Sequence, residues 1–359
     1  MSQIAVNIMV KNARDSILGA LKSAEPFVDE IVVFDTGSSD GTQAVVQDYF
    51  SQLPHNVKST FLEVPWIDDF SAIRNQMLEA TSSDWVLALD SDEVLTITGG
   101  TLRDLAQSGY KAFFIEKRSY VKERNIEGFK AITHEYPKQE KGYVGYLSEP
   151  NYLFFEKNPR VHYERCVHET IEMSLLRAQI PSVRTNQVVI HNHGRHDMSA
   201  KGPWYSTLIK KLTAQSPDDG LAWCYQGVQQ KEEGNLEQAL LSFDNSIRLI
   251  PGYAAPKLMK ARCLIALGRA NEAEQLLIHL SASHSNEEVI WIELLKLDAL
   301  KPNGAELVNG RITQLETQKA ATPDIYETAA QILVKMKKQV KAEIYRKRAR
   351  ELKKYLRRS

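Results

Sequence analysis

Three acidic residues follow directly after the apolar run 85–89: Asp90, Asp92 and Glu93. Asp90 and Asp92 are separated by one residue, and positions i and i+2 of an extended segment point to the same side, so both carboxylates can face one polar ligand. Two hard oxygen ligands suit Mg²⁺ or Mn²⁺, which keeps several waters and is shared with substrate phosphates. The spacing therefore predicts a divalent cation beside a diphosphate. The alternative is a solvated turn, since two acids after a strand often form one.

Two common nucleotide-binding motifs are absent from the sequence. It has no glycine-rich loop ending in a P-loop lysine, and no GxGxxG dinucleotide fingerprint. A nucleoside diphosphate bonded to a transferable group therefore fits the acidic stretch better than ATP or NAD. A nucleotidyltransferase on a similar sheet is disfavoured, because NIMVKNARDS at 7–16 lacks the glycines of the N-terminal loop that such enzymes usually carry.

Alternating strand-like and helical runs make up the first ninety residues. The continuous Ile-Val-Val-Phe run at 31–34 indicates a strand buried on both faces of a parallel sheet. The alternation predicts a doubly wound α/β sheet, in which ligands bind at the carboxyl ends of the strands. Asp35 and the group from Asp90 to Glu93 both lie at such ends. Strands are expected at 5–10, 30–35, 56–64 and 84–89, and helices at 16–24, after the turn in 38–50, and at 68–80.

Residues 4 to about 95 resemble the family 2 glycosyltransferases of the GT-A fold, which is a Rossmann-like nucleotide-sugar domain. The resemblance rests on IMVKN, VDEIVVFDTGSSDGT and WIDDFSAIRNQMLEATSSDWVLALDSDEVL in the family's order, with DSD in the place of its DxD motif. One departure is Lys11-Asn12-Ala13-Arg14, where members usually have Lys-Asn-Glu-Glu, so contacts near the nucleotide base can differ.

The resemblance continues beyond the predicted sheet. NPRVHYERCVHETI at 158–171 is similar to the family's vHE segment. VVIHNHGR at 188–195 is similar to the HyGY segment that closes the catalytic domain in a subgroup with appended repeats, although Arg195 stands where that subgroup often has Tyr. Some bacterial peptide S-glycosyltransferases share this layout, but nothing in the sequence favours a thiol acceptor.

The resemblance implies which residues bind the nucleotide sugar. Asp35 would accept a hydrogen bond from the uracil imide of a UDP-sugar, and Arg74 would contact the base or the diphosphate. Asp90 would reach the ribose or a metal-bound water. Asn12 and His168 complete the implied donor site, His168 by touching the diphosphate or the metal.

The same resemblance implies a metal site and a catalytic pair. Asp92 would ligate Mn²⁺ or Mg²⁺, with Asp90 and His193 as further ligands, since neutral imidazole suits Mn²⁺. Glu169 would be the general base that deprotonates the acceptor, and Asp92 the second catalytic residue. The implied reaction is a metal-dependent, inverting transfer of a sugar to a peptide, protein or glycan acceptor.

Each of these roles has a structural alternative. Asp35 can simply cap the turn before Gly37. Arg74 can pair with Asp68 or Asp69 on its own helix.

The histidine cluster and the tyrosines of 96–150 are equally open. Most of the clustered histidines are expected to be structural, and the tyrosines can stack on a sugar or fix a loop onto the sheet. These residues are His162, His168, His191, His193 and His196, and Tyr136, Tyr143 and Tyr146.

The pattern changes after residue 203. Trp223, Gly227, Gly234, Ala239, Phe243 and Pro251 are spaced as in a tetratricopeptide repeat, and the four small and seam positions among them return about 34 residues later at Ala261, Gly268, Ala273 and Leu277. Small residues at these positions let paired helices approach closely, while Phe243 and Leu277 fill the seam. We therefore expect a GT-A-type domain at 1–203 and an all-α repeat domain at 204–359, which offers a concave interaction surface.

A strongly basic segment ends the sequence, with about a dozen Lys and Arg from Lys335 onward against Glu343 and Glu351. It is either a solvated capping face of the repeats or a landing site for an acidic acceptor or anionic surface.

Composition narrows the class of protein. The 45 basic residues balance 45 acidic ones, which gives no overall field to attract nucleic acid or a membrane surface. Three widely spaced cysteines without CxxC and no apolar segment near about 20 residues predict a cytoplasmic protein without a membrane span. Partners through the repeats and a homodimer are open possibilities. The competing function is a non-catalytic scaffold with a degenerate transferase domain, against which the intact set of Asp35, Arg74, Asp90 and Asp92 argues.

Overall fold

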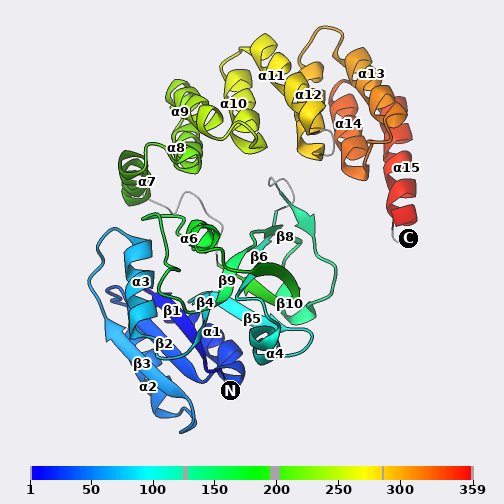
Figure 1. Ribbon diagram of the computed structural model, residues 1–359. Helices are drawn as coiled ribbons and strands as arrows, with labels where there is room; N and C mark the ends of the chain where they lie inside the picture. The colour runs from blue at the N-terminus through cyan, green and yellow to red at the C-terminus, as the bar shows by residue number, and fades with distance from the viewer. Residues whose placement is uncertain (1, 124–127, 195–202, 285–286, 357–359) are drawn as a thin grey trace. The chain divides into compact units, whose positions relative to one another are not determined.

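The computed structural model describes residues 2–123, 128–194, 203–284 and 287–356. Arg195 and His196, which the sequence analysis named, lie outside these ranges. The chain forms two compact units, Met1–Leu208 and Ile209–Ser359, and helix α7 (Pro203–Gln215) runs across the division. The domain boundary predicted after residue 203 stays a prediction. Figure 1 follows the chain from the blue strands of the first unit to the yellow and red helices of the second.

The first unit is built on a mixed sheet whose strand order is β3-β2-β1-β4-β9-β6-β10-β5. Strands β3, β2, β1 and β4 run parallel, and antiparallel β9 joins them to the rest. The short β7 and β8 pair beside β6. In chain order the elements are β1 (Ile4–Val10), α1 (Ile17–Ala24), η1 (Glu25–Phe27), β2 (Glu30–Asp35), α2 (Thr42–Ser51), β3 (Lys58–Glu63), α3 (Phe70–Ala80), β4 (Trp85–Asp90), β5 (Glu93–Ile97), α4 (Leu102–Gln107), β6 (Ala112–Val121), β7 (Lys130–Ala131), α5 (Pro137–Glu140), β8 (Gly145–Ser148), β9 (Asn151–Glu156), α6 (Glu172–Arg177) and β10 (Ser182–Asn192).

The sheet register brings the predicted acidic residues to one edge. Val10 at the end of β1 pairs with Asp35 at the end of β2, and Met9 pairs with Asp90 at the end of β4. The carboxyl ends of these parallel strands therefore meet, as the sequence predicts. Strand β2 is buried along its whole length, whereas β3 is an exposed edge strand.

Helix α3 is fixed at its first turn. The side chain of Asp69 caps it by accepting from the backbone N–H of Ala72 at 2.9 Å. Ile73 and Met77 pack with strand β2 in a buried cluster, so the helix cannot rotate without exposing them. Arg74 on the same helix is thereby held in a fixed place, 9% exposed.

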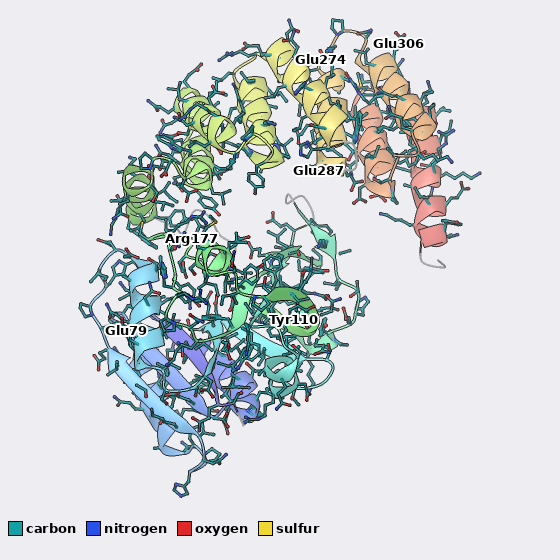
Figure 2. The ribbon with its side chains drawn as sticks, in the orientation of Figure 1. Glu79, Tyr110, Arg177, Glu274, Glu287 and Glu306 are labelled. Carbon is teal, nitrogen blue, oxygen red and sulfur yellow. The ribbon has the colours of Figure 1, made fainter. Side chains whose placement is uncertain are left out.

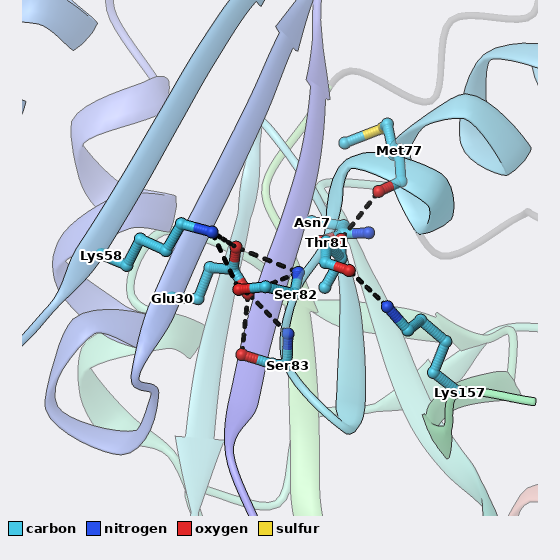
Figure 3. A network of polar contacts seen from close by, with 8 residues as sticks. All are labelled: Asn7, Glu30, Lys58, Met77, Thr81, Ser82, Ser83 and Lys157. Atoms are coloured by element: carbon cyan, nitrogen blue, oxygen red, sulfur yellow. Dashed lines mark hydrogen bonds and ion pairs between the residues drawn. The ribbon is translucent and has the colours of Figure 1, made fainter.

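A buried carboxylate holds the opposite, amino-terminal side of the sheet together (Figure 3). Glu30, the first residue of β2, is 1% exposed. It accepts from the backbone N–H groups of Ser82 and Ser83 at 3.0 and 2.8 Å, and Lys58 lies 3.3 Å away. Burial opposes ionisation of Glu30, but the hydrogen bonds from Ser83 and Ser82 outweigh it and lower its pKa. This network is structural, because it joins β2 to the loop before β4.

The tyrosines that the sequence analysis named within 96–150 have structural roles. Tyr136 and Tyr146 are both 8% exposed, and the guanidinium of Arg118 lies 4.8 and 4.6 Å from their ring centres. The ring centre of Tyr143 lies 5.8 Å from the ring centre of His193. Their rings fix the segment 136–146 onto the sheet, which is the structural one of the two predicted uses.

The second unit is a succession of helices, each packed on the next. Gly227 lies where an added Cβ would meet the Phe243 ring at 2.6 Å, and both residues are buried, so the predicted close approach is confirmed. Farther along the chain, Glu274, labelled in Figure 2, forms an ion pair with Lys301, whose Nζ lies 2.6 Å from Oε1 of Glu274. After α7 the helices are α8 (Gly220–Glu232), α9 (Leu236–Leu249), α10 (Ala254–Ala266), α11 (Ala270–Ser283), α12 (Glu288–Ala299), α13 (Gly304–Thr317), α14 (Pro323–Lys335) and α15 (Gln339–Leu356).

Residues Gln339–Leu356 of the basic segment form α15, whose Ala342, Tyr345 and Ala349 are buried in the core of the repeats. Arg348 pairs with Glu316 of α13, and Lys353 lies 2.7 Å from Glu327 of α14. Part of its charge is therefore used within the unit. None of the described helices is long and apolar enough to cross a membrane.

Candidate active site

A pocket of about 1090 Å³ opens at the carboxyl edge of the sheet. Six of the eight predicted site residues line it, whereas Asp35 and His193 do not. Elements far apart in the sequence contribute: the ends of β1 and β4, the start of α3, strand β6, the segment 163–169 and the start of α7. The charged and polar lining includes Lys11, Asn12, Thr36, Asp68, Arg74, Asp90, Asp92, Glu93, Lys117, Asn151, His168, Glu169 and Asn192.

Arg74 is clamped between two carboxylates. Its Nε donates to Oε1 of Glu169 and a terminal nitrogen donates to Oδ1 of Asp90, both at 2.7 Å. The guanidinium also lies 5.6 Å from the centre of the Tyr163 ring. The alternative, an ion pair with Asp68 or Asp69 on its own helix, is absent from the contacts of Arg74. Strand β4 and the segment around Glu169, separated by nearly eighty residues of chain, are thus joined through one cation.

Lys117 of β6 is a second cation that the sequence analysis did not identify. Its Nζ lies 2.8 Å from Oε1 of Glu93 and 3.7 Å from Oδ2 of Asp90. Burial, followed by the charge of Asp90, raises the pKa of Glu93. Burial also opposes ionisation of Asp90, but Arg74 and Lys117 outweigh it and lower its pKa. Asp90 therefore faces two cations before any ligand binds.

Asp92 occupies the turn between β4 and β5. The amide of Asn192 lies 3.5 Å from its Oδ1, and Gly194 passes so close that an added Cβ would lie 2.0 Å from its Oδ2. The end of β10 therefore supports the carboxylate from one side. Asp92 lines the same pocket as Asp90, as the i, i+2 spacing predicts.

The pocket has an excess of negative charge. Its lining includes three lysine or arginine residues against five aspartates and glutamates. A diphosphate would add further negative charge, so its binding calls for a compensating cation. Carboxylate oxygens are the ligands that Mg²⁺ and Mn²⁺ prefer.

The predicted metal set of Asp90, Asp92 and His193 is not assembled. Within the described ranges, no three His, Cys, Asp or Glu side chains gather closely enough to hold a metal ion by themselves. The His193 ring stacks on the Tyr120 ring, with the two ring centres 5.2 Å apart. Its Nε2 lies 3.1 Å from the carbonyl oxygen of Gln139. It turns away from the pocket because these partners hold it. The residues present fit a cation that takes its remaining ligands from substrate and water.

Asp35 has one oxygen in use and one without a partner. Its Oδ1 accepts from the backbone N–H groups of Gly37 and Ser38 at 2.8 and 2.7 Å, which is the turn-capping alternative. Its Oδ2 is buried without a hydrogen-bond partner. An orphaned buried carboxylate oxygen is costly, and a ligand N–H would satisfy it. Asn12, at a φ of 53°, accepts from the N–H of Ser39 and so fixes this loop beside β1.

His168 and Glu169 stand side by side on the pocket wall. His168 has a φ of 55°, a strained conformation for a histidine, and its Nε2 lies 2.6 Å from the hydroxyl of Tyr205. This hydrogen bond orients the ring toward α7. Glu169, whose side chain is 16% exposed, is held by Arg74.

Aromatic residues on the pocket wall escaped the sequence analysis. Trp66, Phe70, Trp204 and Tyr205 all line it. Trp204 marked only the start of the repeat domain in the sequence, yet it belongs to the pocket of the first unit. A tryptophan in the first turn of a helix carries no signal of which cavity it will face, so this assignment needed the structure.

Comparison with known proteins finds a family match within the first unit. Residues 5–150 match the family described as Glycosyl transferase family 2. The chain carries a family 2 glycosyltransferase domain. Residues 231–292 match the tetratricopeptide repeat family. The predicted resemblance and fold class, a GT-A-like domain followed by helical repeats, are therefore confirmed.

Individual relatives match parts of the chain. A TPR repeat-containing protein of Synechococcus elongatus is 28% identical over 248 residues, which are 67% of this chain and 55% of the relative. The SPbeta prophage-derived glycosyltransferase SunS of Bacillus subtilis is 24% identical over 166 residues, 46% of this chain and 34% of the relative. The chain thus spans about half or less of these relatives. A crystal structure of S. aureus TarS covers 59% of this chain and 39% of its own, with 15% identity and a TM-score of 0.37.

Proposed function

We propose that the chain is a metal-dependent, inverting glycosyltransferase that moves a sugar from a nucleoside-diphosphate sugar, with UDP as the nucleotide, to a peptide, protein or glycan acceptor. The observation that carries the proposal is the clamp of Arg74 between Asp90 and Glu169 in an acid-rich pocket at the carboxyl edge of the sheet. The family match of residues 5–150 supports the same class of reaction.

The nucleotide end of the donor belongs at the ends of β1 and β2. The partnerless Oδ2 of Asp35 would accept from the imide N–H of uracil, and Asn12 holds the adjoining loop in place. Because Asp35 is 0% exposed, the base reaches it only if the loop after β2 yields slightly. The diphosphate would then lie along the pocket toward Asp92 and Lys117.

The metal would bind at Asp92. Asp90 already pairs with Arg74 and Lys117, so it contributes less as a ligand. A bound Mn²⁺ or Mg²⁺ supplies compensation for the charge on the departing diphosphate. His193 is no part of this proposal, since the fold holds it at the carbonyl of Gln139.

Glu169 would act as the general base. Arg74 engages its Oε1, which fixes the carboxylate, and the other oxygen would take the proton from the acceptor nucleophile. One displacement at the anomeric carbon forms the new bond as the bond to the diphosphate breaks, so the configuration inverts. Lys117 and Arg74 provide positive charge beside the leaving group.

The alternative is a non-catalytic scaffold that acts through the repeats. Whether the chain is a transferase or a scaffold, the repeats would bind an acceptor or a protein partner. A homodimer and a cytoplasmic location are expectations from the sequence. The scaffold predicts no use for the orphaned oxygen of Asp35 or for the strained backbone of His168.

Calorimetry with UDP and Mg²⁺ tests the donor site. Asp35→Asn should weaken binding by about 1–3 kcal/mol through the lost charge-assisted hydrogen bond, and Asp92→Asn should remove the dependence of binding on Mg²⁺. Asp84→Asn, on the opposite side of the sheet beside Gln3, is the control and should leave both unchanged. Unaltered affinity in both pocket variants would refute the proposed donor site.

A further inference from the structure

The pocket has an aromatic wall made of Trp66, Phe70, Trp204 and Tyr205. Ring centres of successive members lie 4.6 Å apart for Trp66 and Phe70, 6.4 Å for Phe70 and Trp204, and 5.8 Å for Trp204 and Tyr205. The rings meet at 61°, 52° and 83°, so they form a faceted apolar surface and not a flat stack. Trp204 is 48% exposed despite its size, which leaves part of this surface open to a ligand.

Three hydrogen bonds hold members of the wall in place. The indole N–H of Trp66 donates to Asp68 at 2.7 Å, and the hydroxyl of Tyr205 lies 2.6 Å from Nε2 of His168. The backbone N–H of Phe70 donates to the carbonyl of Cys166 at 2.9 Å. The rings of Trp66, Phe70 and Tyr205 therefore present mainly carbon to the pocket.

Phe70 and Tyr205 of the wall adjoin the segment of the proposed general base, whereas Trp66 packs against the buried cluster that contains Phe34, beside Asp35. Cys166, which holds Phe70, is three residues before Glu169, and His168, which holds Tyr205, is its direct neighbour. Asn12 and Asp35 lie instead at the ends of β1 and β2. An acceptor must approach Glu169, so the part of the wall formed by Phe70, Trp204 and Tyr205 is on the acceptor side of the pocket.

We infer that the aromatic wall binds an apolar or aromatic side chain of a peptide acceptor, next to the residue that receives the sugar; this rests on the proposed function. An apolar side chain gains from contact with exposed ring surface. A sugar acceptor would need partners for its hydroxyl groups, and those left unpaired on burial would weaken its binding. The engaged polar groups of Trp66 and Tyr205 therefore favour the peptide side chain.

Small probes test the wall without knowledge of the full acceptor. N-acetyl-phenylalaninamide, N-acetyl-serinamide and methyl β-glucoside are titrated into the full chain with UDP and Mg²⁺ present, and their affinities are compared by ligand-observed NMR. The phenylalanine probe is expected to bind best. Trp204→Ala should weaken it by about tenfold, the typical loss for a central aromatic contact, and Trp204→Phe should retain most of the affinity.

Tyr110→Ala is the matched control, because Tyr110 is an exposed aromatic residue of the same unit that does not line the pocket (Figure 2). It should leave binding unchanged. Preference for methyl β-glucoside would assign the wall to a sugar acceptor and overturn the inference. Weaker binding of the phenylalanine probe with UDP than without it, or an equal loss in Tyr110→Ala, would also overturn it.

The inference and the proposed function fail in different ways. If the chain hydrolyses no nucleotide sugar but the phenylalanine probe still binds at Trp204, the transferase proposal fails and the apolar site stands. If a donor is hydrolysed and no probe binds the wall, the acceptor inference alone is wrong.

Discussion

Removal of the Arg74 guanidinium should destabilise the first unit through the two carboxylates it leaves behind. Arg74→Met keeps the aliphatic part of the side chain and deletes two hydrogen bonds of 2.7 Å, to Asp90 and Glu169. Breaking a buried pair from one side costs about 3–5 kcal/mol. Since the side chain of Asp90 is 40% exposed and water can replace part of the lost contact, we expect a loss of about 2–4 kcal/mol.

Hydrogen exchange measures this loss where it arises. The two compact units need not unfold together, so a single unfolding curve would mix their stabilities. The free energy of opening is therefore taken from the amides of β1, β4 and α3 by mass spectrometry. The control is Arg103→Met, which breaks the more exposed pair with Asp29 and should cost below about 1 kcal/mol.

A double-mutant cycle with Glu169→Gln separates the ion pair from general packing. Glu169→Gln should cost less in the Arg74→Met background than in the intact chain, because the cation that needs Glu169 is already gone. Equal losses for Arg74→Met and Arg103→Met, or strict additivity with Glu169→Gln, would refute the clamp.

Three further substitutions test other parts of the account. Glu30→Gln should lower the free energy of unfolding at neutral pH by about 1–3 kcal/mol. Because folding lowers the pKa of Glu30, the stability that its carboxylate contributes is lost as the pH falls below the ordinary 4.5. The difference in stability between Glu30→Gln and the intact chain should therefore shrink at low pH. Gly194→Ala should displace the Asp92 carboxylate and reduce metal-dependent turnover with little loss of stability in a thermal scan. Gly227→Ala should drive a methyl group into the Phe243 ring and cost the repeats about 1–3 kcal/mol by denaturant unfolding.

The chain offers matched controls for the glycine substitutions. Gly99→Ala is expected to be silent in turnover, since an added Cβ there meets only a side-chain carbon at 4.0 Å. Gly310→Ala in α13 meets nothing within 4 Å and should stabilise its helix by about 0.4–1 kcal/mol. A pH-independent effect of Glu30→Gln, normal turnover in Gly194→Ala, or a stabilised Gly227→Ala would each contradict the corresponding contact.

The sequence predicts the parallel half of the sheet well because its signals are local. The buried run of β2, the capping Asp69 of α3 and the acids at the ends of β2 and β4 each follow from neighbouring residues. The antiparallel strand β9 between β4 and β6 depends on pairings across more than sixty residues of chain. No local sequence pattern predicts this pairing, so only the structure shows that the sheet combines parallel and antiparallel strands.

The site was predictable in its residue types but not in its pairings. The acids, Arg74 and Glu169 follow from the family's motifs, whereas the clamp of Arg74 requires knowledge of which side chains converge. Lys117 lies in the middle of a strand without a motif, and nothing local to His193 indicates its contacts with Tyr120 and the carbonyl of Gln139.

The most direct test is a panel of nucleotide sugars offered to the full chain with Mn²⁺, Mg²⁺ or a chelator, without acceptor. The account predicts slow hydrolysis of one donor that requires the metal, release of the inverted anomer by NMR, and loss of most turnover in Asp92→Asn, about 2.7–4 kcal/mol for such an electrostatic group. Turnover that persists in the chelator or in Asp92→Asn would contradict the metal site, and a folded, UDP-binding chain that hydrolyses no donor of the panel would contradict the transferase itself.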